Sequence, residues 1–244
     1  MPLKASPDDQ SHLLELQAID TRLQQLDHKA KTLPESALLA GLSSEADALR
    51  VELLSATGVI EDAQLELSRV ESDVAVVEAR VARDTERLQV SSSVKDVAGL
   101  ESELAGLRKR QLDLEEIELT VMERLEGLEA AASVLTAKHD ELQVTIAKVT
   151  ADRDAALATL TSERNHSAAN RSTIAGKLPE ELLALYERQR YGTGASLLRG
   201  GMSSASGVKL NENDMAAIRA AAPDDVVLCP DSSAILVRTA ESGL

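Results

Sequence analysis

The chain has 244 residues, with no Phe, no Trp and only two Tyr, although 43% of its residues are hydrophobic. Compact cores draw much of their buried area from aromatic side chains, so this composition argues against one large globular core and favours thin helical packing. The net charge of −15 at pH 7 disfavours binding to phosphate backbones and anionic membrane surfaces, because like charges repel.

The charge is unevenly distributed along the chain. Residues 1–176 hold 32 acidic and 19 basic side chains, whereas residues 177–244 hold nine acidic and seven basic ones. Any nucleic-acid contact is therefore expected in the C-terminal part.

Cys229 is the single cysteine, which excludes an internal disulfide. The N-terminus has no signal-like apolar run, and no segment approaches 18 consecutive apolar residues, so we expect a cytoplasmic protein without membrane contact.

The first apolar series begins near the N-terminus with alternating steps of three and four residues, which is typical of a helix. Its members are Leu16, Ile19, Leu23, Leu26 and Leu33, with Ala30 at the remaining position. Pro34 then interrupts the pattern, because proline lacks an N–H group and clashes with the preceding helical turn. We expect a break near residues 34–43, with Ser36 as the N-cap of the next helix.

Two longer series follow, each with a seven-residue repeat. One comprises Leu53, Ile60, Leu67, Val74, Val81 and Leu88, with Ala56, Ala63, Val70 and Val77 as a second row. The other comprises Leu100, Leu107, Leu114, Val121, Leu128, Leu135, Leu142, Val149 and Ala156. Heptads sustained over this length predict a coiled coil rather than an ordinary amphipathic helix.

The serine run at residues 91–93 separates these two series, and the helical stretches on its two sides have similar lengths. The sequence therefore predicts an antiparallel coiled-coil hairpin over residues 1–176, with its tip near residues 91–93. A parallel homodimer of one long helix is the alternative, which Pro34 and the serine run disfavour. Whether the protein is a monomer or a homodimer of hairpins stays open.

Gly176 and Pro179 mark the start of a small head, residues 177–244. A short helix is expected from residue 178, a Gly- and Ser-rich linker over 191–207, and a further helical turn over 213–222. The apolar runs 226–228 and 235–237 suit short strands. The predicted fold class is mainly α, with a small α/β head.

The head resembles that of bacterial coiled-coil proteins with a C-terminal four-cysteine zinc ribbon. The resemblance is most specific in LPEELLALYER (178–188) and in CPDSSAILVR (229–238). In that family, two Cys-x-x-Cys knuckles bind one structural zinc. The matching positions here are Ser203, Ser206, Cys229 and Ser232, so the resemblance implies a zinc site in which three ligand positions hold serine.

Serine hydroxyls stay protonated and bind zinc poorly, whereas structural zinc prefers thiolates. We therefore expect no cofactor in this chain, and one zinc only in a version of the head with all four cysteines. A head without metal is expected to be loosened or held by apolar packing alone. The serines fit either an engineered variant or a natural loss of the metal.

Several residues of the head are candidates for binding a partner or a nucleic acid: Tyr186, Arg188, Arg190, Arg199, Lys209 and Arg238. From composition, ordinary surface charge is the favoured interpretation of the basic ones. Tyr186 and Tyr191 are the only aromatics that could stack on bases, and single-strand binders use several such platforms. The histidines have no ligand spacing, and no phosphate loop or nucleophile elbow is found, so we expect no enzyme.

The resemblance implies an adaptor or scaffold that binds protein partners through the coiled coil and the ribbon-like head. The alternative function is a regulatory protein that binds RNA or DNA through the head, since some relatives with this architecture are implicated in RNA binding.

Overall fold

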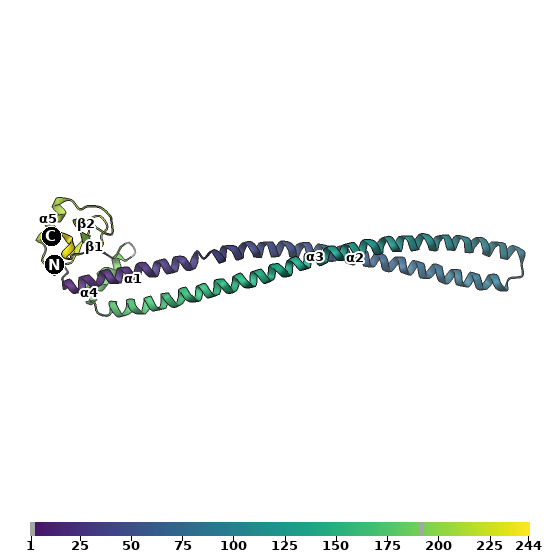
Figure 1. The fold of residues 1–244 in the computed structure, drawn as a ribbon, viewed down its shortest axis with the longest axis horizontal. Coiled ribbons are helices and arrows are strands. Elements are labelled where there is room, and N and C mark those ends of the chain that lie inside the picture. The colour runs from purple at the N-terminus through teal and green to yellow at the C-terminus, as the bar shows by residue number, and fades with distance from the viewer. Residues whose placement is uncertain (1–2, 191–192) are drawn as a thin grey trace. The chain divides into compact units, whose positions relative to one another are not determined.

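The computed structural model describes residues 3–190 and 193–244, and most of them are helical (Figure 1). Three long helices come first, namely α1 (Pro7–Lys31), α2 (Pro34–Val90) and α3 (Val94–Ala175). A small mixed α/β head follows them. The predicted fold class, a helical hairpin with an α/β head, is confirmed.

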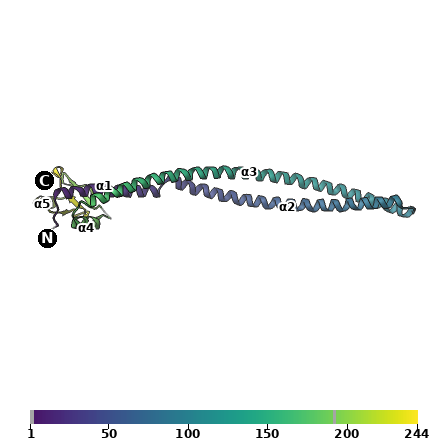
Figure 2. The same ribbon diagram turned by 90° about the horizontal axis from the view of Figure 1, so that it is seen from below.

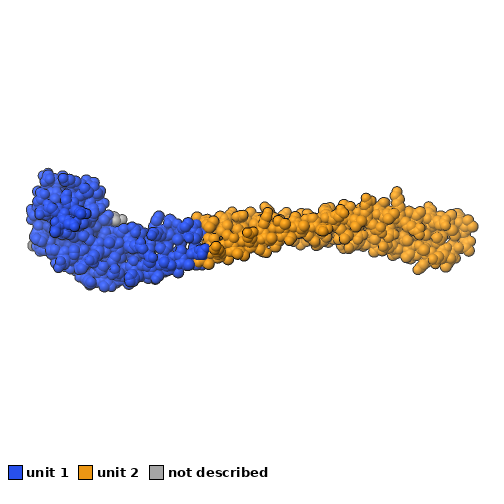
Figure 3. Space-filling model, viewed as in Figure 1, with its two compact units in different colours: residues 1–36, 152–244 blue, residues 37–151 orange. Residues whose placement is uncertain are grey.

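Two compact units divide the chain (Figure 3). One contains residues 37–151, and the other contains residues 1–36 together with 152–244. The boundary expected from the sequence, at residue 176, lies elsewhere. The difference arises because α1 and the end of α3 share a core with the head, and heptad spacing carries no signal of that contact.

In residues 37–151, α2 and α3 lie side by side (Figures 1 and 2). The heptad seam is confirmed, since its positions are buried or half-buried while most positions between them are exposed. The most buried seam residues are Ala63, Leu104, Leu114 and Val121. Ion pairs Arg80–Glu103 and Arg124–Glu66 join the two helices outside the seam. These pairs establish the antiparallel pairing of α2 with α3.

The turn between α2 and α3 consists of residues 91–93. The N–H of Asp96 approaches the Ser93 hydroxyl oxygen at 3.5 Å. Since the first amides of a helix have no partner within it, this contact helps to begin α3.

The interruption between α1 and α2 is shorter than expected and lies at residues 32 and 33. The interval 34–43 is helical instead. Pro34 takes the first position of α2, where a missing N–H costs nothing. Ser36 lies within α2, and its N–H donates to the carbonyl of Leu33.

The head contains the helices α4 (Glu180–Gln189) and α5 (Glu212–Ala220) and the 3₁₀ turn η1 (Ala240–Ser242). Its strands are β1 (Ala195–Arg199), β2 (Met202–Ser203), β3 (Val227–Leu228) and β4 (Ile235–Val237). They form a sheet in the order β2-β1-β4-β3, in which β1 and β4 are parallel and the other pairs antiparallel. β1 and β2 lie in the stretch expected to be linker, so that expectation was wrong for residues 195–203.

Two apolar clusters form the core of the unit that contains the head. The first joins α1, the end of α3, α4 and the sheet through Leu13, Leu16, Ile174, Leu182 and Tyr186. The second lies between the sheet and α5, and includes Leu198, Leu210, Met215, Ile218, Cys229 and Leu236. The N-terminal helix is therefore part of the head's core.

Candidate functional site

Most of the candidate binding residues in the head are engaged in contacts within the chain. Tyr186 is fully buried, so its ring cannot stack on a base. Arg190 pairs with Glu187 and Asp20, and Arg199 pairs with Glu241 at 3.2 Å. Arg188, Arg199 and Lys209 are exposed. Tyr191 lies outside the described residues.

A buried polar cluster joins α1, α3 and α4 around Asp20, whose side chain is 1% exposed. Arg171 donates to both Asp20 carboxylate oxygens, at 2.6 and 3.1 Å. The Tyr186 hydroxyl donates to Asp20 Oδ2 at 2.8 Å. A buried carboxylate is stable only when it is paired in this way. Asp20 was not among the predicted site residues, because nothing in the heptad pattern distinguishes it from other charges beside the seam.

The contacts in this cluster shift the pKa values of Tyr186 and Glu187. Burial, together with the hydrogen bond to Asp20, raises the pKa of the Tyr186 hydroxyl well above its ordinary value. Burial alone would raise the pKa of Glu187, but hydrogen bonds from Arg171 and Arg190 lower it below its usual range. The cluster therefore holds a neutral phenol and an ionised carboxylate at neutral pH.

The raised pKa of Tyr186 predicts a loss of stability in alkali. Above about pH 10, the unfolded chain releases the Tyr186 proton while the folded chain retains it, so the free energy of unfolding falls as pH rises. Melting temperatures measured across this pH range, with tyrosinate absorbance as the second readout, test this prediction. Tyr186→Phe is expected to flatten the pH dependence. Equal pH dependence of the melting temperature in wild type and Tyr186→Phe would contradict this prediction.

Arg238 follows β4 and binds backbone rather than presenting its charge outward. Its guanidinium donates to the carbonyl oxygens of Ala221, Ala222, Pro223 and Asp225 at 2.7–3.2 Å, and approaches that of Ile218 at 3.5 Å. These carbonyls lie at the end of α5 and in the loop after it, where helix carbonyls lack partners. This arrangement gives Arg238 a structural role.

The four positions that match zinc ligands lie in two turns at one end of the sheet. Ser203 and Cys229 are buried, and Ser206 and Ser232 are half-buried. Burial raises the pKa of the Cys229 thiol, but hydrogen bonds from Ser232, from the Asp231 amide and from Ser203 lower it below the ordinary value. Ser203, Cys229 and Ser232 are thus brought together.

On the outer face of α2, Leu54, Leu65 and Val76 are exposed by 65%, 57% and 64% of their surfaces. They are spaced eleven residues apart, which is close to three full helical turns, so they form one stripe along the helix. The stripe lies outside the heptad seam. Its eleven-residue spacing is the sequence signal that could have predicted it.

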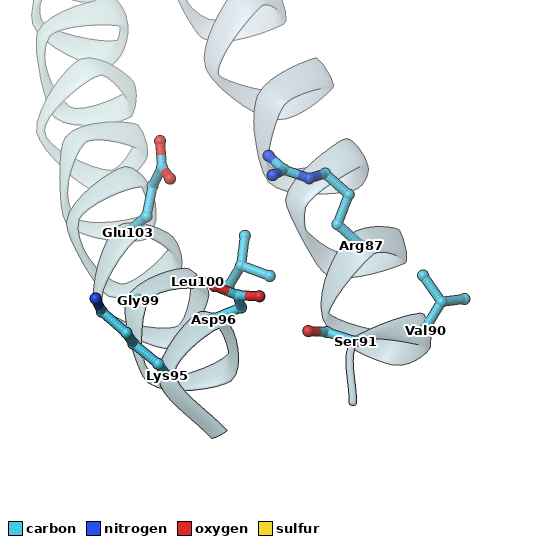
Figure 4. A pocket seen from close by; sticks show the side chains of 8 residues that line it. All are labelled: Arg87, Val90, Ser91, Lys95, Asp96, Gly99, Leu100 and Glu103. Atoms are coloured by element: carbon cyan, nitrogen blue, oxygen red, sulfur yellow. The ribbon is translucent and has the colours of Figure 1, made fainter. Parts of the chain in front are cut away.

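The grooves along residues 37–151 are shallow and open. Figure 4 shows one near the turn, with a volume of about 550 Å³, lined by Arg87 of α2, by Ser91 of the turn and by Lys95, Asp96 and Leu100 of α3. Its charged side chains have both signs. Within residues 3–190 and 193–244, no three His, Cys, Asp or Glu side chains are placed to hold a metal ion. None of the helices in this part of the chain is long and apolar enough to cross a membrane.

Comparison with known proteins identifies relatives over nearly the whole chain. A protein of Mycobacterium tuberculosis (strain H37Rv) is 34% identical over 239 residues, which cover 97% of this chain and 98% of that protein. A solved structure from Mycobacterium smegmatis is also 34% identical, with a TM-score of 0.87, and the match covers 97% of this chain and all of that one. These relatives share the head as well as the hairpin.

CT398 from Chlamydia trachomatis has a solved structure that matches with a TM-score of 0.66 at 16% identity, over 94% of this chain and 97% of that one. At this identity the match shows a common fold alone. The family model for the CT398-like coiled coil hairpin domain matches residues 16–194. The chain therefore belongs to the family of CT398-like coiled-coil hairpin proteins.

Proposed function

We propose that this chain is a non-enzymatic cytoplasmic adaptor whose helical hairpin binds a basic amphipathic helix of a partner protein. The observation that carries the proposal is the stripe of Leu54, Leu65 and Val76 on the outer face of α2. Single exposed apolar side chains are common on protein surfaces. These three recur about every 16 Å along one side of α2, so a partner helix that lies along this side can contact all of them.

The charge of this unit supports a basic partner. Residues 37–151 hold 23 acidic and 12 basic side chains, which gives a net charge of −11. Complementary charge steers association and disfavours partners of the same sign. An acidic surface around an apolar stripe therefore favours a helix whose apolar face is bordered by Lys and Arg, and disfavours RNA or DNA along the hairpin.

Substitution of the stripe is expected to weaken partner binding. In Leu54→Gln/Leu65→Gln/Val76→Gln, each lost apolar contact removes on the order of 1.5 kcal/mol, about tenfold in affinity. A photo-crosslinker at position 65 in cells captures the partner, and mass spectrometry locates its crosslinked segment. The affinity of the purified partner is then measured for wild type and variant. Because the substituted residues lie outside the seam, helicity is expected to stay unchanged.

The matched control is Leu112→Gln/Leu119→Gln/Val134→Gln, which removes equally exposed apolar side chains from the outer face of α3. It is expected to retain binding. Crosslinks from position 65 that reach only a second copy of the chain would refute the adaptor. So would salt-sensitive RNA or DNA binding that is lost on changing Arg188 and Lys209 to alanine, since that result supports the nucleic-acid function.

A further inference from the structure

The two turns that carry the ligand-matched positions have the same backbone geometry. In the first, the carbonyl of Ser203 accepts the N–H of Gly207 at 2.9 Å. In the second, the carbonyl of Cys229 accepts the N–H of Ser233, also at 2.9 Å. The donor residue has positive φ in both turns, 65° at Gly207 and 59° at Ser233. Ser233 is the one non-glycine residue with positive φ in the described ranges, so the second turn is held against its local preference.

The hydroxyls in these turns satisfy backbone groups within them. Ser206 Oγ accepts the N–H of Val208 at 3.3 Å, and Ser232 Oγ accepts the N–H of Ala234 at 3.4 Å, so both occupy the same position in their turns. Ser203 Oγ accepts the N–H of Ala205 at 3.3 Å and lies 3.1 Å from Ser196 Oγ. The hydroxyls are therefore already bonded in the closed turns.

This donor set does not fit structural zinc. Such sites use four ligands from thiolate, imidazole and carboxylate groups, and these positions supply one thiol and three hydroxyls. A hydroxyl would have to lose its proton, and give up its backbone hydrogen bond, to replace a thiolate. The two turns share one backbone geometry, but they lack the ligand chemistry that structural zinc requires.

Apolar packing provides an alternative source of stability for the head. Cys229 is 2% exposed and belongs to the cluster of Leu198, Met215, Ile218 and Leu236, where it packs as a small apolar side chain. In small metal domains, metal binding supplies the folding energy. Here the second apolar cluster lies between the sheet and α5, and it includes Cys229 of the second turn. That turn is therefore held by apolar packing.

We infer that the head of this chain folds without metal. Its two turns are closed by backbone hydrogen bonds to the carbonyls of Ser203 and Cys229, and the hydroxyls of Ser203, Ser206 and Ser232 accept amides within the turns. The inference concerns the head alone and does not depend on the adaptor function. Two results follow from it: the wild type needs no zinc, and cysteines at the three serine positions create a zinc site.

The test measures zinc content and melting temperature for the full chain with and without a chelator. Wild type is expected to contain no stoichiometric zinc after purification from zinc-supplemented cells, and its melting temperature is expected to be the same with the chelator. Ser203→Cys/Ser206→Cys/Ser232→Cys is expected to bind one zinc per chain, with a melting temperature that falls on chelation. Cobalt binding to this variant is expected to give the absorption of tetrahedral thiolate ligation.

A control places two cysteines one residue along the same turns, in Ser204→Cys/Ser233→Cys, and is expected to bind no stoichiometric zinc. Zinc in the wild type, or a chelator-dependent melting temperature, would overturn the inference that the head is metal-free. If the triple variant takes up no zinc, or if the control takes up as much, then positions 203, 206, 229 and 232 do not correspond to zinc-ligand positions.

Discussion

Arg238→Met is expected to destabilise the head by about 3 kcal/mol, because it leaves the carbonyls at the end of α5 and in the following loop without their charged donor. The shortest bonds, to Ala222 and Asp225 at 2.7 Å, contribute most. Arg238→Lys is expected to recover only part of the loss, since an ammonium group cannot reach several carbonyls with the planar fork of a guanidinium. Urea denaturation gives the free energy, and hydrogen exchange at β1 and β4 amides locates the loss in the head.

Arg219 provides the control for this prediction. It lies on α5, pairs with Glu212 at 3.8 Å and is 48% exposed. Arg219→Met is expected to change stability by less than about 0.5 kcal/mol, as for other exposed ion pairs. Equal effects of Arg238→Met and Arg219→Met would show that Arg238 is an ordinary surface charge, as the sequence analysis allowed.

Asp20→Ala is expected to cost about 3–5 kcal/mol, because it leaves the guanidinium of Arg171 partly buried without its main partner and removes the acceptor of the Tyr186 hydroxyl. The expected structural result is loosening of α4 from α1 and α3, which faster hydrogen exchange in α4 would report. Chemical denaturation of Asp20→Ala, Arg171→Ala and the double variant gives the coupling energy between the two side chains.

Asp27 and Arg164 form the matched exposed pair between the same two helices, at 2.8 Å and with side chains 48% and 51% exposed. Asp27→Ala is expected to cost less than about 1 kcal/mol. If Asp20→Ala lowers the free energy of unfolding no more than Asp27→Ala does, burial does not strengthen the Asp20–Arg171 pair. The proposed role of Asp20 in holding α4 against α1 and α3 would then be wrong.

Local sequence patterns predicted the hairpin because each pattern records a physical requirement at short range. Seven-residue spacing of Leu and Val keeps one stripe of each helix against its neighbour, as the burial of Leu114 and Val121 shows. Pro34 predicted a break between two helices, but the break lies before Pro34, at residues 32 and 33, and not after it. Proline is tolerated at the first turn of a helix, so the break precedes it.

The candidate binding residues were chosen from charge and aromaticity, which indicate chemistry but not exposure. Arg188 and Lys209 are exposed, whereas Tyr186 is a core residue and Arg238 binds backbone carbonyls. An arginine that caps a helix and an arginine that binds phosphate are the same letter in a sequence. Which one is present depends on the groups that the fold brings within reach.

The sequence by itself determined the helical seam, the absence of an aromatic core and the serine substitutions at the ligand-matched positions, because these are properties of residue type and of spacing within one segment. Tertiary structure alone decided the parallel pairing of β1 with β4 and the burial of Asp20 against Arg171, which lies 151 residues further along. Contacts between segments so far apart leave no periodic pattern in either one, and their energies arise only when the whole chain has closed around them.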